Sequence, residues 1–167
     1  GGCSEPRLHH CTPANAAQVV DEKVPDTKDA IYVFGKDKEM PYSYVGFAMK
    51  HDVFPDEMKN DQSYFIDSYA KNIIAMMLNQ RLKELAQKAD CPFVNASADD
   101  GTYLLSKTKD AFSMDATAKE GKAIEALAAI YREAQRVRQY GFTAGEFARM
   151  KAEYLSQLEA NYVNRNK

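Results

Sequence analysis

The sequence predicts an α+β domain in which a mostly antiparallel sheet is covered by helices on one face. Three observations predict it: short β-branched and aromatic runs bounded by turn residues, a long stretch without Gly or Pro over residues 62–88, and two amphipathic stretches near the C-terminus. The resulting order, ββ, α, βββ, αα, is typical of a layered α+β fold. At 167 residues and 45% hydrophobic content, the chain suffices for one core.

The N-terminal part contains turn residues and no sustained hydrophobic period. Pro6, Pro13 and Pro25 interrupt it, so we expect residues 1–28 to be an irregular leader or linker and residues 29–167 to form a single domain. Two strands are predicted next, at 30–35 and 42–50. The six residues between them are too few for a parallel crossover, so any direct pairing should be antiparallel.

The longest predicted element is an amphipathic helix over residues 62–88. Its apolar positions include Phe65, Tyr69, Ile73, Leu82 and Leu85. Cys91-Pro92 should end it, because proline disfavours helical geometry in the residue before it. Three short strands are predicted after it, at 93–98, 102–108 and 111–116.

Two TxxE sequences, at residues 117–120 and 143–146, fit capping boxes at helix starts. Gly141 is the expected left-handed residue that ends the first of these helices. The second should run over about 144–161. The side chains expected to be buried on the first helix are Ile124, Leu127, Ala128, Ile130, Tyr131 and Ala134, and those on the second are Phe147, Met150, Tyr154, Leu155 and Leu158.

The charge and cysteine content exclude some classes of function. Twenty-two basic residues nearly balance 24 acidic ones, so no single-sign field favours nucleic acid or anionic membranes. No apolar run approaches the roughly 18 residues of a membrane span. Cys3, Cys11 and Cys91 are odd in number without CxxC spacing, which indicates neither a disulfide framework nor a thiolate zinc site. They do not reveal the compartment; a bacterial cell envelope or periplasm is a working hypothesis.

Residues that could carry chemistry are few. His9, His10 and Cys11 could form a zinc site only with further ligands and a rigid frame. His51 stands alone at a strand end, without an HxxxH or HExxH partner. No Gly-rich phosphate loop occurs. Arg81 lies at the edge of the apolar face of the long helix, where a pair with Glu84 or another nearby carboxylate is the simplest interpretation.

Three strings carry a family resemblance: MLNQRLKEL at 77–85, CPF at 91–93 and YGFTAGEF at 140–147. Together with Glu120-Gly121, Ala126-Leu127 and Arg136, they resemble the insulinase/pitrilysin family of zinc metallopeptidases over roughly residues 30–167. The resemblance implies a metallohydrolase fold like that of LuxS and mitochondrial processing peptidase. In that family each half of the enzyme has two similar domains, and the first carries an HxxEH zinc motif.

HxxEH does not occur in this sequence. The chain therefore resembles the later part of the second, non-catalytic domain, truncated at its beginning. The resemblance implies a domain that hydrolyses nothing, holds no cofactor, and supports the chamber and peptide substrates of a zinc metallopeptidase. Zinc would be held by the parent's catalytic domain, the expected partner in the same polypeptide. A truncated sheet would expose an edge, which invites pairing with a second copy.

The resemblance also suggests substrate contacts. In some members an arginine at the position of Arg81 and a later tyrosine bond the substrate backbone. Phe93 is the nearest counterpart of that tyrosine but cannot donate a hydrogen bond, and Tyr103 could take its place. The alternative function is a stand-alone interaction or scaffold module of the same fold, like a core-type subunit without peptidase activity.

Overall fold

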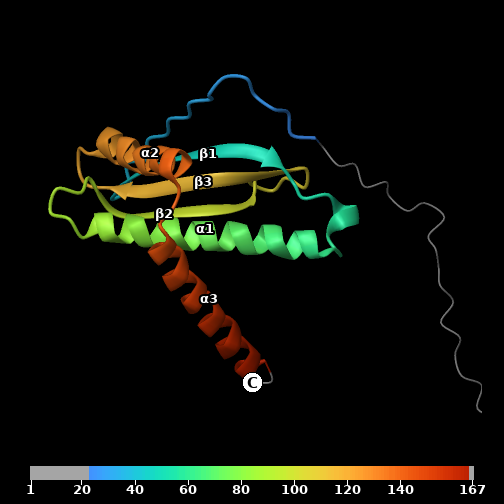
Figure 1. Cartoon of the computed structure of the whole chain (residues 1–167). Helices are drawn as coiled ribbons and strands as arrows, with labels where there is room; N and C mark the ends of the chain where they lie inside the picture. The colour runs from blue at the N-terminus through green and yellow to red at the C-terminus, as the bar shows by residue number, and fades with distance from the viewer. Residues whose placement is uncertain (1–22, 166–167) are drawn as a thin grey trace, which may run out of the picture.

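The computed structural model describes residues 23–165 of the chain. A three-stranded sheet and three α-helices form its frame (Figure 1). The predicted leader lies largely outside the described residues, as do His9, His10 and Cys11. The elements are β1 (Ser43–Asp52), a 3-10 turn (Asp56–Met58), α1 (Gln62–Ala86), β2 (Phe93–Thr102), β3 (Lys109–Ala118), α2 (Ala123–Tyr140) and α3 (Ala144–Asn164).

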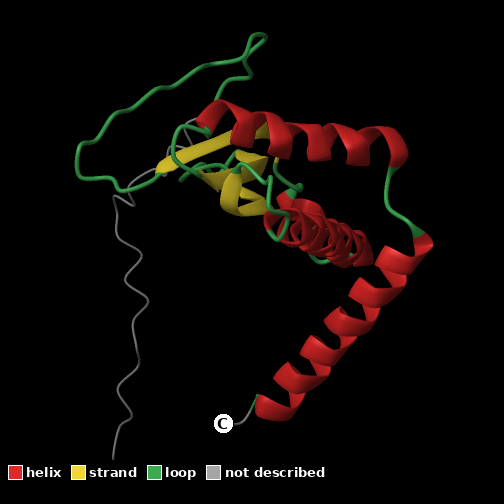
Figure 2. Ribbon diagram, turned by 90° about the vertical axis from the view of Figure 1, so that its left-hand side faces the viewer, coloured by secondary structure: helices red, strands yellow, loops and turns green. Residues whose placement is uncertain are grey.

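The sheet has the order β1-β3-β2, and both pairings are antiparallel. Both α1 and α2 cover the same face, while α3 leads away from the sheet (Figures 1 and 2). The predicted α+β class, with an antiparallel sheet and helices on one face, is therefore confirmed. None of the described helices is both long and apolar enough to cross a membrane.

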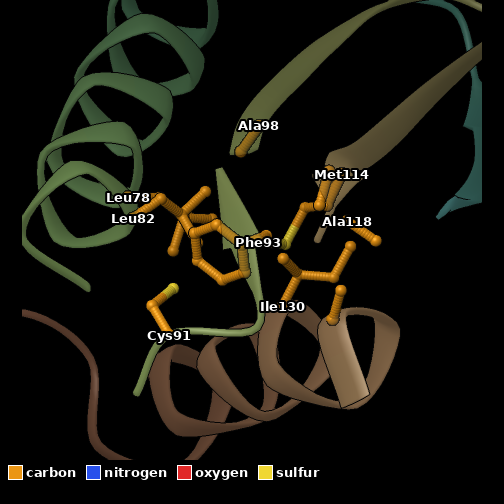
Figure 3. Close-up of a cluster of buried hydrophobic side chains, with 10 residues drawn as sticks. Leu78, Leu82, Cys91, Phe93, Ala98, Met114, Ala118 and Ile130 are labelled. Atoms are coloured by element: carbon orange, nitrogen blue, oxygen red, sulfur yellow. The ribbon is translucent and has the colours of Figure 1, made fainter. Parts of the chain in front are cut away.

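The main core lies between the sheet and the two helices that cover it (Figure 3). Phe93 at the start of β2 is at its centre, 1% exposed, with Leu78 and Leu82 of α1 on one side and Ile130 of α2 on the other. Met114 of β3 forms the floor. Burying each of these side chains contributes roughly 1.5–3 kcal/mol. Together they hold the two covering helices against the sheet.

The long helix forms close to where the sequence predicts it. Its buried side chains are Ile73, Met77, Leu78 and Leu82, whereas Phe65 is exposed. Asn79 ties α1 to the outer edge of β2: its amide donates to Ala98 O at 2.9 Å and accepts from Ala98 N at 2.8 Å. The Asn79 amide thus takes the place of a neighbouring strand's peptide group at that point of the edge.

Two strands, β2 and β3, stand where three were predicted. The predicted strand at 102–108 is wrong, because residues 103–108 reverse the chain and Leu104 has a positive φ of 52°. Ser106 Oγ accepts hydrogen bonds from the backbone N–H groups of Thr108 and Lys109, both at 3.1 Å. This local bonding supplies a turn where the sequence shows an apolar run.

The predicted strand at 30–35 is also wrong. These residues have no regular structure, and the side chains of Ile31, Tyr32, Val33 and Phe34 are 72–91% exposed. The second predicted strand, at 42–50, is confirmed as β1. β-Branched residues favour a strand only when a neighbouring strand is there to pair with, and here none pairs with this segment.

The first predicted helix start is wrong and the second is confirmed. Thr117 belongs to β3, and α2 begins six residues later with Lys122 at its N-cap and no side-chain cap. At α3, Thr143 and Glu146 form a complete capping box. Gly141 follows α2 with the predicted positive φ, 67°, but its ψ of −151° lies outside the left-handed helical region that was expected.

The buried faces of the last two helices differ from those predicted. In α2 the buried residues are Ala126, Ile130 and Glu133, and Ile124 is largely exposed. In α3 only Met150 is buried among the described residues. The exposed apolar side chains of α3 are Phe147, Leu155, Leu158, Tyr162 and Val163. Because α3 leads away from the sheet and packs chiefly against α1, most of its apolar side has no partner in the described part of the chain.

Candidate functional site

Arg81, the residue that the resemblance singles out, projects from α1 towards the turn between α2 and α3. Its Nε donates to Glu146 Oε1 at 2.5 Å and its Nη2 to Glu146 Oε2 at 3.0 Å. Nη2 also donates to the carbonyl of Gly141 at 3.2 Å. Such a bidentate arginine–carboxylate pair fixes both side chains in one geometry. It is a pair with a carboxylate, but not with Glu84, the one nearest in sequence.

The surroundings of this pair complete a compact cluster. The Arg81 guanidinium lies 4.7 Å from the ring centre of Phe142, a cation–π distance. Glu146 Oε2 also accepts from Thr143 N at 2.7 Å and from Thr143 Oγ1 at 2.8 Å. The hydrogen bond from Arg81, together with those from Thr143, lowers the pKa of Glu146 to about 2 although partial burial opposes it. The same hydrogen bond raises the pKa of Arg81.

The Arg81 cluster therefore joins strings MLNQRLKEL and YGFTAGEF across 65 residues of sequence. Three of the Arg81 contacts are made to YGFTAGEF itself, at Gly141, Phe142 and Glu146. Of the three guanidinium nitrogens of Arg81, the buried Nη1 alone lacks a hydrogen-bond partner among residues 23–165. The cluster can lock α1 against α3. For a ligand, Arg81 has only its buried Nη1 group left as a hydrogen-bond donor.

The other two predicted contact residues lie elsewhere. Phe93 is in the core. Tyr103 follows the far end of β2, roughly 30 Å along the strand from Phe93, where its backbone N–H donates to Lys109 O at 3.0 Å and Lys50 Nζ lies 5.7 Å from its ring centre. The structure does not bring Arg81, Phe93 and Tyr103 to one surface, and their contact with substrate stays a prediction.

A cavity of about 710 Å³ lies near Tyr103, between the first half of α1, the 3-10 turn and the β2–β3 connection. Its charged residues are largely paired with one another. Lys71 Nζ lies 3.1 Å from Asp67 Oδ2 and 3.7 Å from Asp100 Oδ1, and Lys59 Nζ lies 2.6 Å from Asp56 Oδ1. This cavity is not predicted from the sequence; the i,i+4 spacing of Asp67 and Lys71 is the one signal there that could have indicated it.

His51 lies beside this cavity. An isolated surface histidine was expected, but His51 has a carboxylate partner. Its Nε2 lies 3.1 Å from Asp100 Oδ1, the oxygen that Lys71 also approaches. A lysine ammonium at that oxygen leaves a poor place for a metal ion. Among residues 23–165 no three His, Cys, Asp or Glu side chains are grouped so that they could hold a metal.

A smaller apolar groove of about 260 Å³ separates α1 from α2 above the sheet. Ile74 and Leu78 form its α1 wall, Tyr131 and Val137 its α2 wall, and Phe112 part of its floor. Its lining contains no acid–base or nucleophilic pair. It is a gap in packing that an apolar side chain could fill.

Comparisons with known proteins find a structural likeness without a sequence match. No family model matches the chain, and no curated protein matches it. The structure is similar to the periplasmic protease PqqL from Escherichia coli, with a TM-score of 0.64 and 21% identity over 75% of this chain and 13% of that one. It is also similar to the first half of PqqL, with a TM-score of 0.66 and 20% identity over 77% of this chain.

The chain spans only 27% of that first half. At this level of identity, the likeness establishes the fold. The described domain has the α+β fold of part of a periplasmic protease.

Proposed function

We propose that this chain is a non-catalytic domain of a larger zinc metallopeptidase, which supports the active-site chamber and its peptide substrate beside a separate catalytic domain. The observation that carries the proposal is the fold, which matches about a quarter of one half of a protease. The metallopeptidase-like strings agree with it, since Arg81 and Glu146 join two of them at one contact. Because the structural neighbours are periplasmic proteases, we also propose a periplasmic location.

Uncovered apolar surface supports a role within a larger protein. Leu155, Leu158 and Tyr162 follow one another along α3 at helical spacing, and each is about half-exposed or more. Exposed apolar stripes of this kind are typical of surfaces that another domain covers. We propose the catalytic domain of the same polypeptide as that neighbour.

The chemistry of the chain supports a non-catalytic role. The sequence has no HxxEH motif, and the residues around Arg81 form a closed set of contacts rather than a base next to a nucleophile. Zinc, polarised water and general base would come from the catalytic domain. This chain's own contribution would be shape and binding surface.

The test compares this chain with its longer parent polypeptide. A quenched fluorescent peptide mixture is incubated with each, with added zinc and with or without a chelator. We expect no turnover from the 167-residue chain and chelator-sensitive turnover from the parent. Chelator-sensitive turnover by the chain alone would overturn the non-catalytic assignment.

The coding sequence upstream of residue 1 provides the second arm. An HxxEH motif there, or in a co-purifying subunit, supports the peptidase assignment. Absence of the motif from both would instead identify the chain as a scaffold module of the same fold. That outcome leaves the fold intact but removes the peptidase role.

A further inference from the structure

Strand β1 has one edge paired with β3 and one edge without a strand partner in the described part of the chain. The other outer strand, β2, is blocked by the side-chain amide of Asn79. The register of β1 with β3 is continuous over all ten residues, without a bulge. A continuous, unprotected edge is a ready template for a further strand.

The segment 26–35 leads from one end of that edge to the other without pairing with it, and it arches away from the sheet (Figure 1). Its beginning is held at the end of β1: Lys109 Nζ lies 2.7 Å from Asp26 Oδ1 and 2.6 Å from Asp52 Oδ1, and Lys50 Nζ donates to Pro25 O at 2.7 Å. Its other end leads through residues 36–42 into the start of β1 (Figure 1). The segment is thus fixed near both ends of β1 and must run antiparallel to it.

The two anchored ends define a single register. If Asp26 lies opposite Asp52, as their shared contact with Lys109 suggests, then Gly35 lies opposite Ser43 and ten residues face ten. The connection 36–42 already contains a turn, in which Glu39 N donates to Asp37 Oδ1 at 2.9 Å. No residue needs to be inserted or removed to close this hairpin.

In this register the exposed apolar side chains acquire neighbours. Directly opposite residues of antiparallel strands share a face, so Val33 falls beside Val45 and Ile31 beside Phe47, on the face that carries the core. The ring of Phe47 already packs edge-on against Tyr131 of α2, with 5.6 Å between ring centres. On the outer face Tyr32 falls beside Gly46, next to the Asp115 carboxylate that already occupies the space above this glycine.

We propose that residues 26–35, called the strap below, close onto the free edge of β1 of the same chain as a fourth strand. The strap then has two states, this closed one and the open one that the structure shows. Lys28 would lie opposite Lys50, and this like-charge pair opposes closure. Closure covers the edge through which a second copy could otherwise pair. The strap therefore decides whether β1 is available to a partner strand.

Cross-linking tests the register. In a Cys3→Ser, Cys11→Ser background, Phe34→Cys with Tyr44→Cys places two thiols directly opposite, while Val33→Cys with Tyr44→Cys places them on opposite faces. We expect the first pair to form a disulfide within one chain at least about tenfold faster than the second. Equal rates would overturn the proposal. Disulfides formed only between chains would overturn it in favour of pairing between copies.

Hydrogen exchange tests the closure without new thiols. Lys28→Glu should slow exchange of the alternate β1 amides that face away from β3, and Val33→Asp should speed it, each by about tenfold. Leu105→Asp, an exposed change at the β2–β3 turn, is the matched control and should leave these amides unchanged. No response to either strap variant, with helical circular dichroism retained, would overturn closure while leaving the proposed function untouched.

Discussion

Arg81 and Glu146 form a bidentate ion pair that joins the C-terminal part of α1 to the first turn of α3. The side chain of Arg81 is 14% exposed and that of Glu146 is 18% exposed, so solvent screens the pair only in part. The family resemblance assigns Arg81 to substrate, whereas these contacts favour a structural role. The two roles predict different results for the same substitution.

We expect Arg81→Ala to lower the free energy of unfolding by about 2–3 kcal/mol, because it leaves the Glu146 carboxylate with half of its partners. Glu146→Gln keeps the cap and removes the charge, and the double variant should show a coupling of about 1–2 kcal/mol. Urea denaturation of the four proteins measures it. Zero coupling, together with a raised KM in the parent, would return Arg81 to substrate contact.

Acid should weaken this contact. The folded pKa of Glu146 is about 2, below its ordinary value of 4.5, because Arg81 and Thr143 donate hydrogen bonds to the carboxylate. The stabilisation is therefore present in full above about pH 4.5 and is lost as the pH falls towards 2. Its upper bound is about 3 kcal/mol. Glu146→Gln should flatten the dependence of unfolding free energy on pH in this window; an unchanged slope would contradict the assignment.

The cap of α3 makes a separate contribution. Thr143 Oγ1 accepts from Glu146 N at 3.2 Å and donates to Glu146 Oε2 at 2.8 Å. Thr143→Ala removes both bonds and should cost about 1 kcal/mol. Thr143→Ser keeps the hydroxyl and should stay within about 0.5 kcal/mol of wild type in thermal denaturation. Equal losses in both variants would mean that the methyl group, not the cap, matters.

The comparison of the two TxxE sequences shows what sequence patterns can and cannot predict. The box at Thr143 forms because no other structure competes for it. Thr117 instead lies in the central strand β3, where it pairs with Tyr44 of β1 and Asn95 of β2. This pairing between distant segments overrides the local preference of TxxE for a helix start. The stretch without Gly or Pro over residues 62–88 located α1 well, because helix-breaking residues act within one element and need no partner.

The Arg81 cluster illustrates the same limit at the site. Sequence patterns marked both strings that contain its residues, but a pairing across 65 residues has no periodic signal. The segment 30–35 failed for a related reason, since its composition is strand-like while its pairing depends on an edge that composition does not describe.

Asn79 should protect both stability and solubility. It satisfies the N–H and the carbonyl of Ala98, a residue 4% exposed. Asn79→Leu leaves both groups unpaired and should cost about 2 kcal/mol. Asn79→Asp keeps the acceptor for Ala98 N but sets a carboxylate against Ala98 O, so it should also destabilise. Chemical denaturation gives the stabilities, and light scattering should show faster association of the Leu variant through the opened β2 edge.

Gly46 is required in β1 because of what lies across from it in β3. A Cβ there would meet Asp115 Oδ1 at 2.1 Å and the carbonyl oxygen of Met114 at 2.8 Å. Gly46→Ala should therefore cost about 1–3 kcal/mol. Asp115 Oδ1 is the end of a side chain and can move aside, whereas the carbonyl of Met114 belongs to the backbone of the central strand and can move only by disturbing its pairing.

Asp115→Ala in the same chain separates the two clashes. It removes the contact with the side chain and leaves the contact with the Met114 backbone, so we expect it to restore part, but not all, of the stability lost in Gly46→Ala. Gly35→Ala is the matched control, since a Cβ there meets nothing within 4 Å. Thermal denaturation of the wild type and these three variants decides: full restoration would assign the whole cost to Asp115, and no restoration would assign it to the backbone of β3.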